Sequence, residues 1–117
     1  MKKCEFSELH GKTLSEIIIS ENRIEFITKG GNKYAQYHEQ DGGESVWLET
    51  HDGDISDLIG SEILLADEVT DATYNPKSWI QMTHTFYKLA TIKGSCTFIW
   101  RGESNGCYSE TVDIFEI

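Results

Sequence analysis

Residues 38–44 hold the densest group of side chains suited to chemistry. Four polar side chains stand there around a pair of glycines, Gly42 and Gly43: His38, Gln40, Asp41 and Glu44. Adjacent glycines allow the backbone to take positive φ angles and to approach a ligand or another chain closely. Polar groups on such a turn, beside a rigid strand, are typical of a binding site. They complete no catalytic motif, so this segment predicts binding rather than catalysis.

A metal centre is one alternative interpretation of this segment, because His51 and Asp52 follow it closely. A catalytic zinc ion needs three ligands from well-placed elements, often with a short spacing between histidines. The spacing here matches no such pattern. We therefore favour a turn with solvated polar side chains, and we expect no metal and no cofactor.

Cysteine chemistry is a second alternative. Cys107 precedes Tyr108, and Cys96 alternates with Phe98 and Trp100. Either thiol would need a histidine from elsewhere in the chain to act as a nucleophile. Alternation with aromatic residues instead favours a small apolar core side chain for Cys96. General acid–base catalysis needs two groups with pKa values driven apart, and among 20 Asp and Glu residues some carboxylates meet by chance. We expect a protein that is not an enzyme.

Aromatic residues and arginine offer another kind of site. An aromatic face beside a cation stacks a nucleotide base and holds its phosphates. Trp47 and Trp100 fit a core, whereas Trp79 and Tyr74 flank a predicted loop and stay open to a ligand. Arg101 is expected at a strand end beside a glycine-containing turn, where anion contact and a surface salt bridge are both open. The full candidate ligand site comprises the following residues: His38, Gln40, Asp41, Glu44, Trp79, Arg101, Ser104, Asn105 and Tyr108.

Charge limits the partners of this chain. Ten Lys and Arg residues stand against 20 Asp and Glu, which gives a net charge of -10. Direct binding to duplex nucleic acid requires a broad basic patch that this chain cannot supply, and an anionic membrane surface is excluded on the same ground. Acidic character leaves three interpretations: plain solubility, attraction to a basic protein surface, and mimicry of nucleic acid.

Three features predict a cytoplasmic location. The three cysteines are an odd number without CxxC spacing, which favours reduced thiols over a disulfide framework. No apolar run approaches the ~18 residues of a membrane span. Lys2 and Lys3 are not followed by the apolar stretch of a signal peptide.

The elements that must position these residues are short strands. Period-two alternation and turn residues predict strands at 13–20, 23–28, 33–37, 45–49, 62–69, 79–92, 95–101 and 107–115. A helical turn is expected at 6–9, and one short helix near 55–59 with Asp54 as its N-cap and Gly60 as its end. Residues 70–78, which include Pro76, are expected to form a mobile loop or lid. The sequence thus predicts a single β-rich domain over residues 1–117, an antiparallel meander of about seven or eight strands forming a half-barrel or sandwich.

Several segments follow one family pattern in the same order along the chain: residues 11–13, 37–41, 44–46, 53–60, 63–69, 85–94 and 100–109. On these segments the chain from Leu14 onwards resembles a family of small uncharacterised proteins found mainly in bacteriophages and prophage-bearing bacteria. Where that family has a Cys-Cys pair, this chain has Gly42-Gly43, so a thiol or metal role of that pair is absent or dispensable here. The resemblance implies a phage accessory protein acting in an infected bacterial host.

Small acidic or β-rich phage proteins are often counter-defence factors, and this association shapes the functional hypotheses. The first is a non-enzymatic protein that sequesters a small nucleotide-type immune signal. Exposed strand edges and small size favour a homo-oligomer in that case. The alternative is an acidic inhibitor, or nucleic-acid mimic, that blocks a host defence nuclease of the anti-CRISPR or anti-restriction type. Turnover of the ligand would indicate a hydrolase instead.

Overall fold

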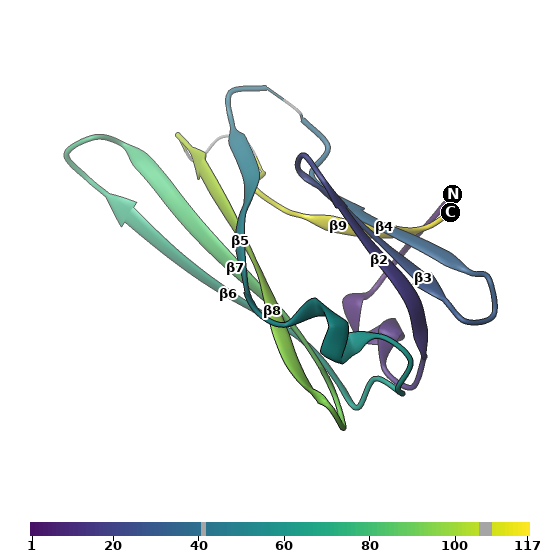
Figure 1. Ribbon diagram of the computed structural model, residues 1–117. Helices are drawn as coiled ribbons and strands as arrows, with labels where there is room; N and C mark the ends of the chain where they lie inside the picture. The colour runs from purple at the N-terminus through teal and green to yellow at the C-terminus, as the bar shows by residue number, and fades with distance from the viewer. Residues whose placement is uncertain (41, 106–108) are drawn as a thin grey trace.

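Alternating apolar and polar residues build two antiparallel sheets that face each other (Figure 1). The computed structural model describes residues 1–40, 42–105 and 109–117. The five-stranded sheet has the order β1-β9-β4-β3-β2, with bounds β1 Lys2–Cys4, β2 Leu14–Ser20, β3 Arg23–Thr28, β4 Lys33–Tyr37 and β9 Asp113–Glu116. The four-stranded sheet has the order β5-β8-β7-β6, with bounds β5 Ser45–Gly53, β6 Leu65–Asn75, β7 Ile80–Thr91 and β8 Gly94–Ser104. The predicted mainly β, antiparallel fold is confirmed, and the sheets do not close into a barrel.

The core lies between the two sheets, where the inward residues of facing strands meet. Ile24 and Phe26 of β3 are fully buried, as are Cys96 and Phe98 of β8. The rings of Phe26 and Phe98 pack edge to face across the gap, with their centroids 5.8 Å apart. Trp100 follows on the same face of β8 and is only 1% exposed. The predicted inward face of this strand is therefore confirmed, with Cys96 as a small core residue.

Two 3-10 turns complete the described elements, η1 at Phe6–Leu9 and η2 at Ile55–Leu58. Asp54 caps η2, because its Oδ1 accepts a hydrogen bond of 2.9 Å from the backbone N–H of Ser56. Gly60 takes a φ of +83°, a left-handed conformation that favours glycine. The expected short helix near 55–59 is thus present as one capped 3-10 turn.

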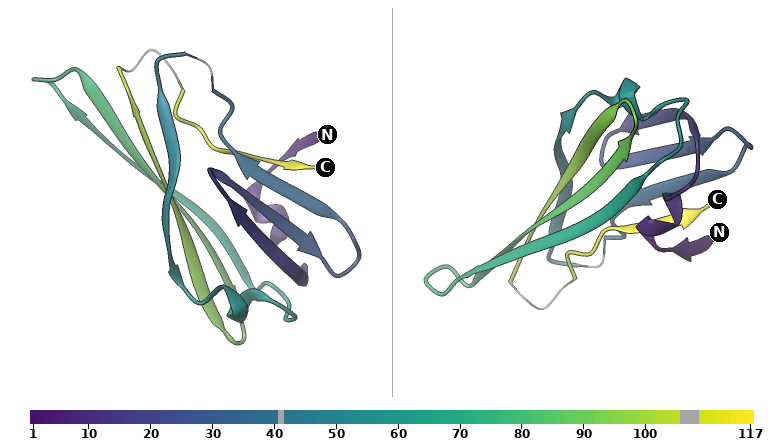
Figure 2. Two further views of the ribbon diagram at one scale, coloured as in Figure 1. Left: turned by 45° about the horizontal axis from the view of Figure 1, so that its top comes forward. Right: turned by 90° about the horizontal axis from the view of Figure 1, so that it is seen from below.

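The predicted loop at 70–78 is wrong. β6 runs through to Asn75 and pairs residue for residue with β7, so only residues 76–79 form a turn. Val69, Thr70 and Thr73 are β-branched and favour extended backbone. Pro76 restricts Asn75 to extended conformations, which the last residue of a strand already has. The hairpin of β6 and β7 projects beyond the rest of the molecule (Figure 2), whose extents are 47 × 28 × 21 Å.

Other boundaries also differ from expectation. β6 begins at Leu65 instead of residue 62, since Ile63 is buried and Glu62 forms an isolated bridge to Thr13, the residue before β2. β5 extends past Glu49 to Gly53. Of the expected strand at 107–115, residues 107 and 108 lie outside the described residues, 109–112 are not in a strand, and the rest lies in β9, which belongs to the other sheet and pairs with the short strand β1. Within the described residues no helix is long and apolar enough to cross a membrane.

Candidate functional site

His38 and Glu44 form a buried pair that fastens the 38–44 segment to the C-terminal segment. His38 Nε2 lies 2.7 Å from Glu44 Oε2, and the two side chains are 6% and 0% exposed. His38 Nδ1 lies 2.7 Å from the carbonyl oxygen of Thr111. A carbonyl only accepts, so Nδ1 carries a hydrogen and donates it, while Nε2 faces the carboxylate. Both side chains therefore hold the structure together at the position where the sequence predicts ligand contacts.

Other groups of this turn also form hydrogen bonds with Glu44, through its carboxylate and its backbone carbonyl. The backbone N–H of Gly42 donates to Glu44 Oε1 at 2.7 Å. Gln40 Nε2 donates to the carbonyl oxygens of Gly42 and Glu44, at 3.0 Å and 2.8 Å. Gln40 itself is exposed, whereas Glu44 is buried. Asp41, the remaining candidate of this segment, lies outside the described residues.

Arg101 sits in the middle of a strand, which corrects its expected place at a strand end. β8 continues to Ser104, and Gly102 is a buried strand residue instead of part of a turn. The Arg101 guanidinium lies over the Trp47 ring at 5.6 Å from its centroid, and donates to Glu103 Oε1 at 3.0 Å. Its Nε is buried and has no hydrogen-bond partner among the described residues. The half-exposed Trp47 therefore supports a surface cation instead of filling the core as expected.

Three of the segments in the predicted ligand site meet at a shallow depression of about 220 Å³. Its lining comes from the 38–44 turn and its neighbour, from the end of the β6–β7 hairpin and from the end of β8: Gly43, Ser45, Ile80, Glu103, Ser104 and Asn105. Trp79, next to Ile80, is at the hairpin tip and is 70% exposed with a φ of +59°. Tyr108 lies outside the described residues. The structure thus brings the predicted segments together, but the Ser104 hydroxyl donates to Glu110 at 2.8 Å and is buried.

A larger groove, of about 380 Å³, lies on the inner face of β6 and β7. We call it the acidic groove. Residues of the two strands and of the segment 109–112 line it: Glu68, Thr70, Ala72, Gln81, Thr83, Thr85, Tyr87, Ser109, Glu110, Thr111 and Val112. Carboxylates, hydroxyls and one amide supply its polar atoms, and none of the described residues that line it is Lys, Arg or His. A second hollow of about 190 Å³ shares Glu68, Tyr87, Thr111 and Val112 with it and extends to Gln36 and Lys3.

The sequence reasoning missed this groove, although a signal for it exists. On β7 the inward positions change from apolar Leu89 and Tyr87 to Thr85, Thr83 and Gln81 toward the hairpin. Polar residues at inward positions indicate where the apolar core ends along the strand, although Thr83 and Thr85 are themselves still buried. The alternate residues of β7 taken separately therefore distinguish the apolar, core half of the strand from the polar half that lines the groove.

The surroundings of Glu68 in the acidic groove disfavour its charged form. Its side chain reaches solvent, yet desolvation by its surroundings raises the pKa of Glu68, and the nearby carboxylates Glu5 and Asp113 raise it further. Burial likewise raises the pKa of Tyr87 well above its usual value. The Tyr87 hydroxyl therefore keeps its hydrogen and donates to the carbonyl oxygen of Val112 at 3.2 Å. The groove thus concentrates negative charge, and its described lining supplies no cation to balance it.

The segment 109–112 lies on the sheet because Gly102 leaves room for it. A Cβ added at Gly102 would stand 2.8 Å from Glu110 Cβ and 3.0 Å from Glu110 Oε1. That oxygen is buried and has no hydrogen-bond partner within the described part of the chain, while Oε2 accepts from Ser104. Gly102 therefore allows a carboxylate to lie directly on the inner face of β8.

A histidine and a cysteine lie close together outside the hollows described above: His51 Nδ1 is 3.9 Å from Cys96 Sγ. Such a pair is relevant to catalysis by a thiol nucleophile. A thiol attacks as its thiolate. Burial raises the pKa of Cys96 to about 11, and Asp52 and Asp54 contribute to the shift. Cys96 is also fully buried. This pair therefore lacks the exposed thiolate that a nucleophile requires. Among the described residues, no group of three or more His, Cys, Asp or Glu is placed to hold a metal ion.

The fold and the site define an all-β protein of two antiparallel sheets with an open, acidic groove. The chain belongs to the family described as a domain of unknown function, DUF7448, whose pattern matches residues 7–114. No curated protein and no solved structure matches the chain.

Proposed function

We propose that this protein is a non-catalytic binding protein whose acidic groove holds a basic segment of a partner protein. The composition of the groove carries this proposal. Its lining provides the carboxylates of Glu68 and Glu110 with a row of hydroxyls, and its described residues include no Lys, Arg or His. Ammonium and guanidinium groups donate up to three and five hydrogen bonds and accept none, so carboxylates, together with hydroxyls that can also accept, suit them.

The electrostatic state of Glu68 supports the same ligand class. Desolvation, Glu5 and Asp113 all disfavour its ionised form. A bound cation would offset that repulsion and stabilise the carboxylate, so the cost present in the free protein is relieved in the complex. Concentrated like charge of this kind is typical of functional sites.

The net charge of -10 adds a long-range contribution. An acidic protein and a basic surface attract each other before contact, which raises the association rate and makes binding sensitive to salt. A volume of about 380 Å³ admits one or two long side chains, so the groove would anchor a larger contact surface.

The biological setting that we propose follows from the phage resemblance. A host defence nuclease presents a basic surface where it binds nucleic acid. An acidic protein that occupies that surface would block it, as an anti-CRISPR or anti-restriction factor does. Phage origin, the counter-defence role and the cytoplasm of an infected host are parts of this proposal.

A second candidate function, sequestration of a nucleotide-type immune signal, is favoured by one specific observation. The Arg101 guanidinium lies over Trp47, and its buried Nε has no hydrogen-bond partner in the described structure. An aromatic ring with an adjacent cation suits a base and a phosphate. We rank it second because Glu103 already pairs with Arg101.

Titration calorimetry with four ligands separates the two functions. The panel contains a nine-residue polyarginine peptide, a polyglutamate peptide of equal length, a cyclic dinucleotide and ADP-ribose. The proposal predicts binding of polyarginine alone. Binding of a nucleotide with intact ligand recovered after heat denaturation would favour the second function, whereas altered ligand would indicate an enzyme. Failure of polyarginine to bind would overturn the proposal.

A further inference from the structure

β6 has a long free edge at the border of the four-stranded sheet. It pairs with β7 on one side, and no other described strand pairs with its second side. Residues 3–6 and Glu68 line a common hollow, so the N-terminal segment lies near the start of β6. From Val69 to Asn75 every residue is exposed, and this part belongs to the hairpin that projects from the body (Figures 1 and 2).

This free edge lacks several of the devices that usually prevent edge pairing, although Asp71 and Glu68 place charges on it. Such devices include lysine or proline within the strand, a bulge, a covering loop and charged side chains. Residues 69–75 contain neither Lys nor Pro, and their register with β7 runs without a shift. Threonine and valine residues favour an extended strand there. The edge therefore offers a template of unpaired backbone N–H and C=O groups.

We propose that two copies of this chain pair antiparallel through the free edges of β6, with Ala72 of one copy opposite Ala72 of the other. This register keeps the inner faces of both copies on one side of a continuous eight-stranded sheet, because paired positions then differ by an even number of residues. Two four-stranded sheets joined at their β6 edges give that number.

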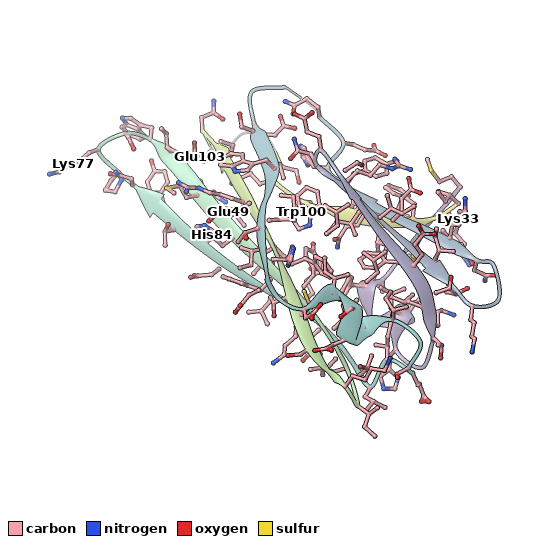
Figure 3. All side chains as sticks on the ribbon, in the orientation of Figure 1. Lys33, Glu49, Lys77, His84, Trp100 and Glu103 are labelled. Atoms are coloured by element: carbon pink, nitrogen blue, oxygen red, sulfur yellow. The ribbon has the colours of Figure 1, made fainter. Side chains whose placement is uncertain are left out.

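Charge disfavours one neighbouring register. A shift that centres the pairing on Asp71 would set two carboxylates directly opposite each other, which is destabilising. Centring it nearer the start of β6 would drive the second copy into the N-terminal segment beside Glu68. With Ala72 at the centre, Asp71 of each copy lies opposite Thr73 of the other, so no two carboxylates are paired directly. Lys77 stands at the hairpin tip beyond the end of β6 (Figure 3).

The consequence for binding rests on the function proposed above. Glu68, Thr70 and Ala72 form the β6 side of the acidic groove. In the proposed register only Ala72 meets its own copy, so the two grooves lie on one side of the joined sheet and meet at their Ala72 ends, with Glu68 of each copy at the far end. A basic partner would then contact both copies at once, which strengthens binding through effective concentration.

Disulfide trapping tests the pairing without any ligand. Cys4 and Cys107 are first replaced by Ser, while the buried Cys96 is kept. Ala72→Cys is then compared with Val69→Cys, which lies on the same exposed strand. In the proposed register the two thiols introduced at position 72 face each other, whereas those introduced at position 69 stand about 20 Å apart. We expect Ala72→Cys to form covalent dimer at least about tenfold faster, because paired thiols have a high effective concentration.

Sedimentation analysis of the native chain and of Ala72→Asp completes the test. We expect a native dimer, and a folded monomer for Ala72→Asp, because the exposed position tolerates the new side chain while two like charges meet at the axis. A native monomer at high concentration, or equal trapping at positions 72 and 69, would overturn the proposed pairing. Neither result involves polyarginine. If the chain does not dimerise, the proposed ligand of the groove is unaffected, and if polyarginine does not bind, the proposed dimer is unaffected.

Discussion

The two faces of the four-stranded sheet differ in whether their charged side chains have partners of opposite charge. On the outer face, Arg101 pairs with Glu103 at 3.0 Å, and His84 lies 3.4 Å from Glu49 (Figure 3). On the inner face, Glu68 stands among carboxylates, and the described lining of the groove has no cation. The comparison shows that balance of charge, more than the number of charged residues, separates a solvated surface from a candidate site.

Breaking the buried pair that secures the groove wall should have the largest effect. His38→Ala leaves the Glu44 carboxylate buried without its imidazole and releases the carbonyl of Thr111. Removing one partner of a buried pair costs about 3 kcal/mol of unfolding free energy. Urea denaturation measures this loss. His84→Ala breaks an exposed pair on the outer face and should cost below about 1 kcal/mol. Equal losses in the two variants would contradict the structural role of His38.

Filling the space under Glu110 should have the next largest effect. Gly102→Ala brings a methyl group to 2.8 Å from Glu110 Cβ, so the segment 109–112 must move away from the sheet. We expect a loss of about 1–3 kcal/mol, typical of overpacking, and weaker polyarginine binding. Gly30→Ala is the matched control, because its nearest contact would be 3.9 Å away. If Gly102→Ala is as stable as Gly30→Ala, the described position of Glu110 is wrong.

Arg101→Ala probes the outer face and separates the two candidate functions. The half-exposed pair with Glu103 contributes below about 1 kcal/mol to stability. Polyarginine binding should persist, because Arg101 lies outside the acidic groove. A nucleotide sponge would lose its ligand instead. Calorimetry on this variant with both ligands decides between these outcomes.

Neutralising Glu68 should give the smallest change in stability, with a characteristic pH dependence. Its pKa is raised above 4.5 on folding, so the folded state binds the proton more tightly and loses stability as pH rises through the folded pKa. Glu68→Gln should therefore melt at a higher temperature than the native chain at neutral pH. The difference should vanish as the pH falls below 4.5. A lower melting temperature at neutral pH would show that the charge is stabilising.

The sequence predicted the elements that local patterns determine. The strands at 23–28 and 33–37 have the predicted bounds, and the cap at Asp54 and the inward face of β8 are also as expected. Asp71, Asn75 and Pro76 predict a loop at 70–78, but residues 70–75 pair continuously with β7. Their partner strand, not their own composition, determines that they are extended.

The candidate site was less accessible to sequence reasoning. His38 and Glu44 are polar and close together in the sequence, a pattern that predicts a ligand site. In the structure the same closeness allows them to form a buried pair. The acidic groove combines β6, β7 and the segment 109–112, which are distant in the chain. Only the crossing of the C-terminal segment to the other sheet brings these parts together. A short sequence motif cannot predict which sheet the C-terminal segment joins.

The measurement that tests the central claim most directly is polyarginine affinity as a function of salt, for the native chain, Glu68→Gln and Glu16→Gln. Both substitutions remove one negative charge, but Glu16 lies on β2 in the other sheet. We predict that affinity falls steeply between about 50 mM and about 500 mM salt. We also predict that Glu68→Gln weakens binding several-fold while Glu16→Gln leaves it nearly unchanged. Equal weakening by both variants would indicate diffuse attraction to net charge and would contradict a specific acidic groove.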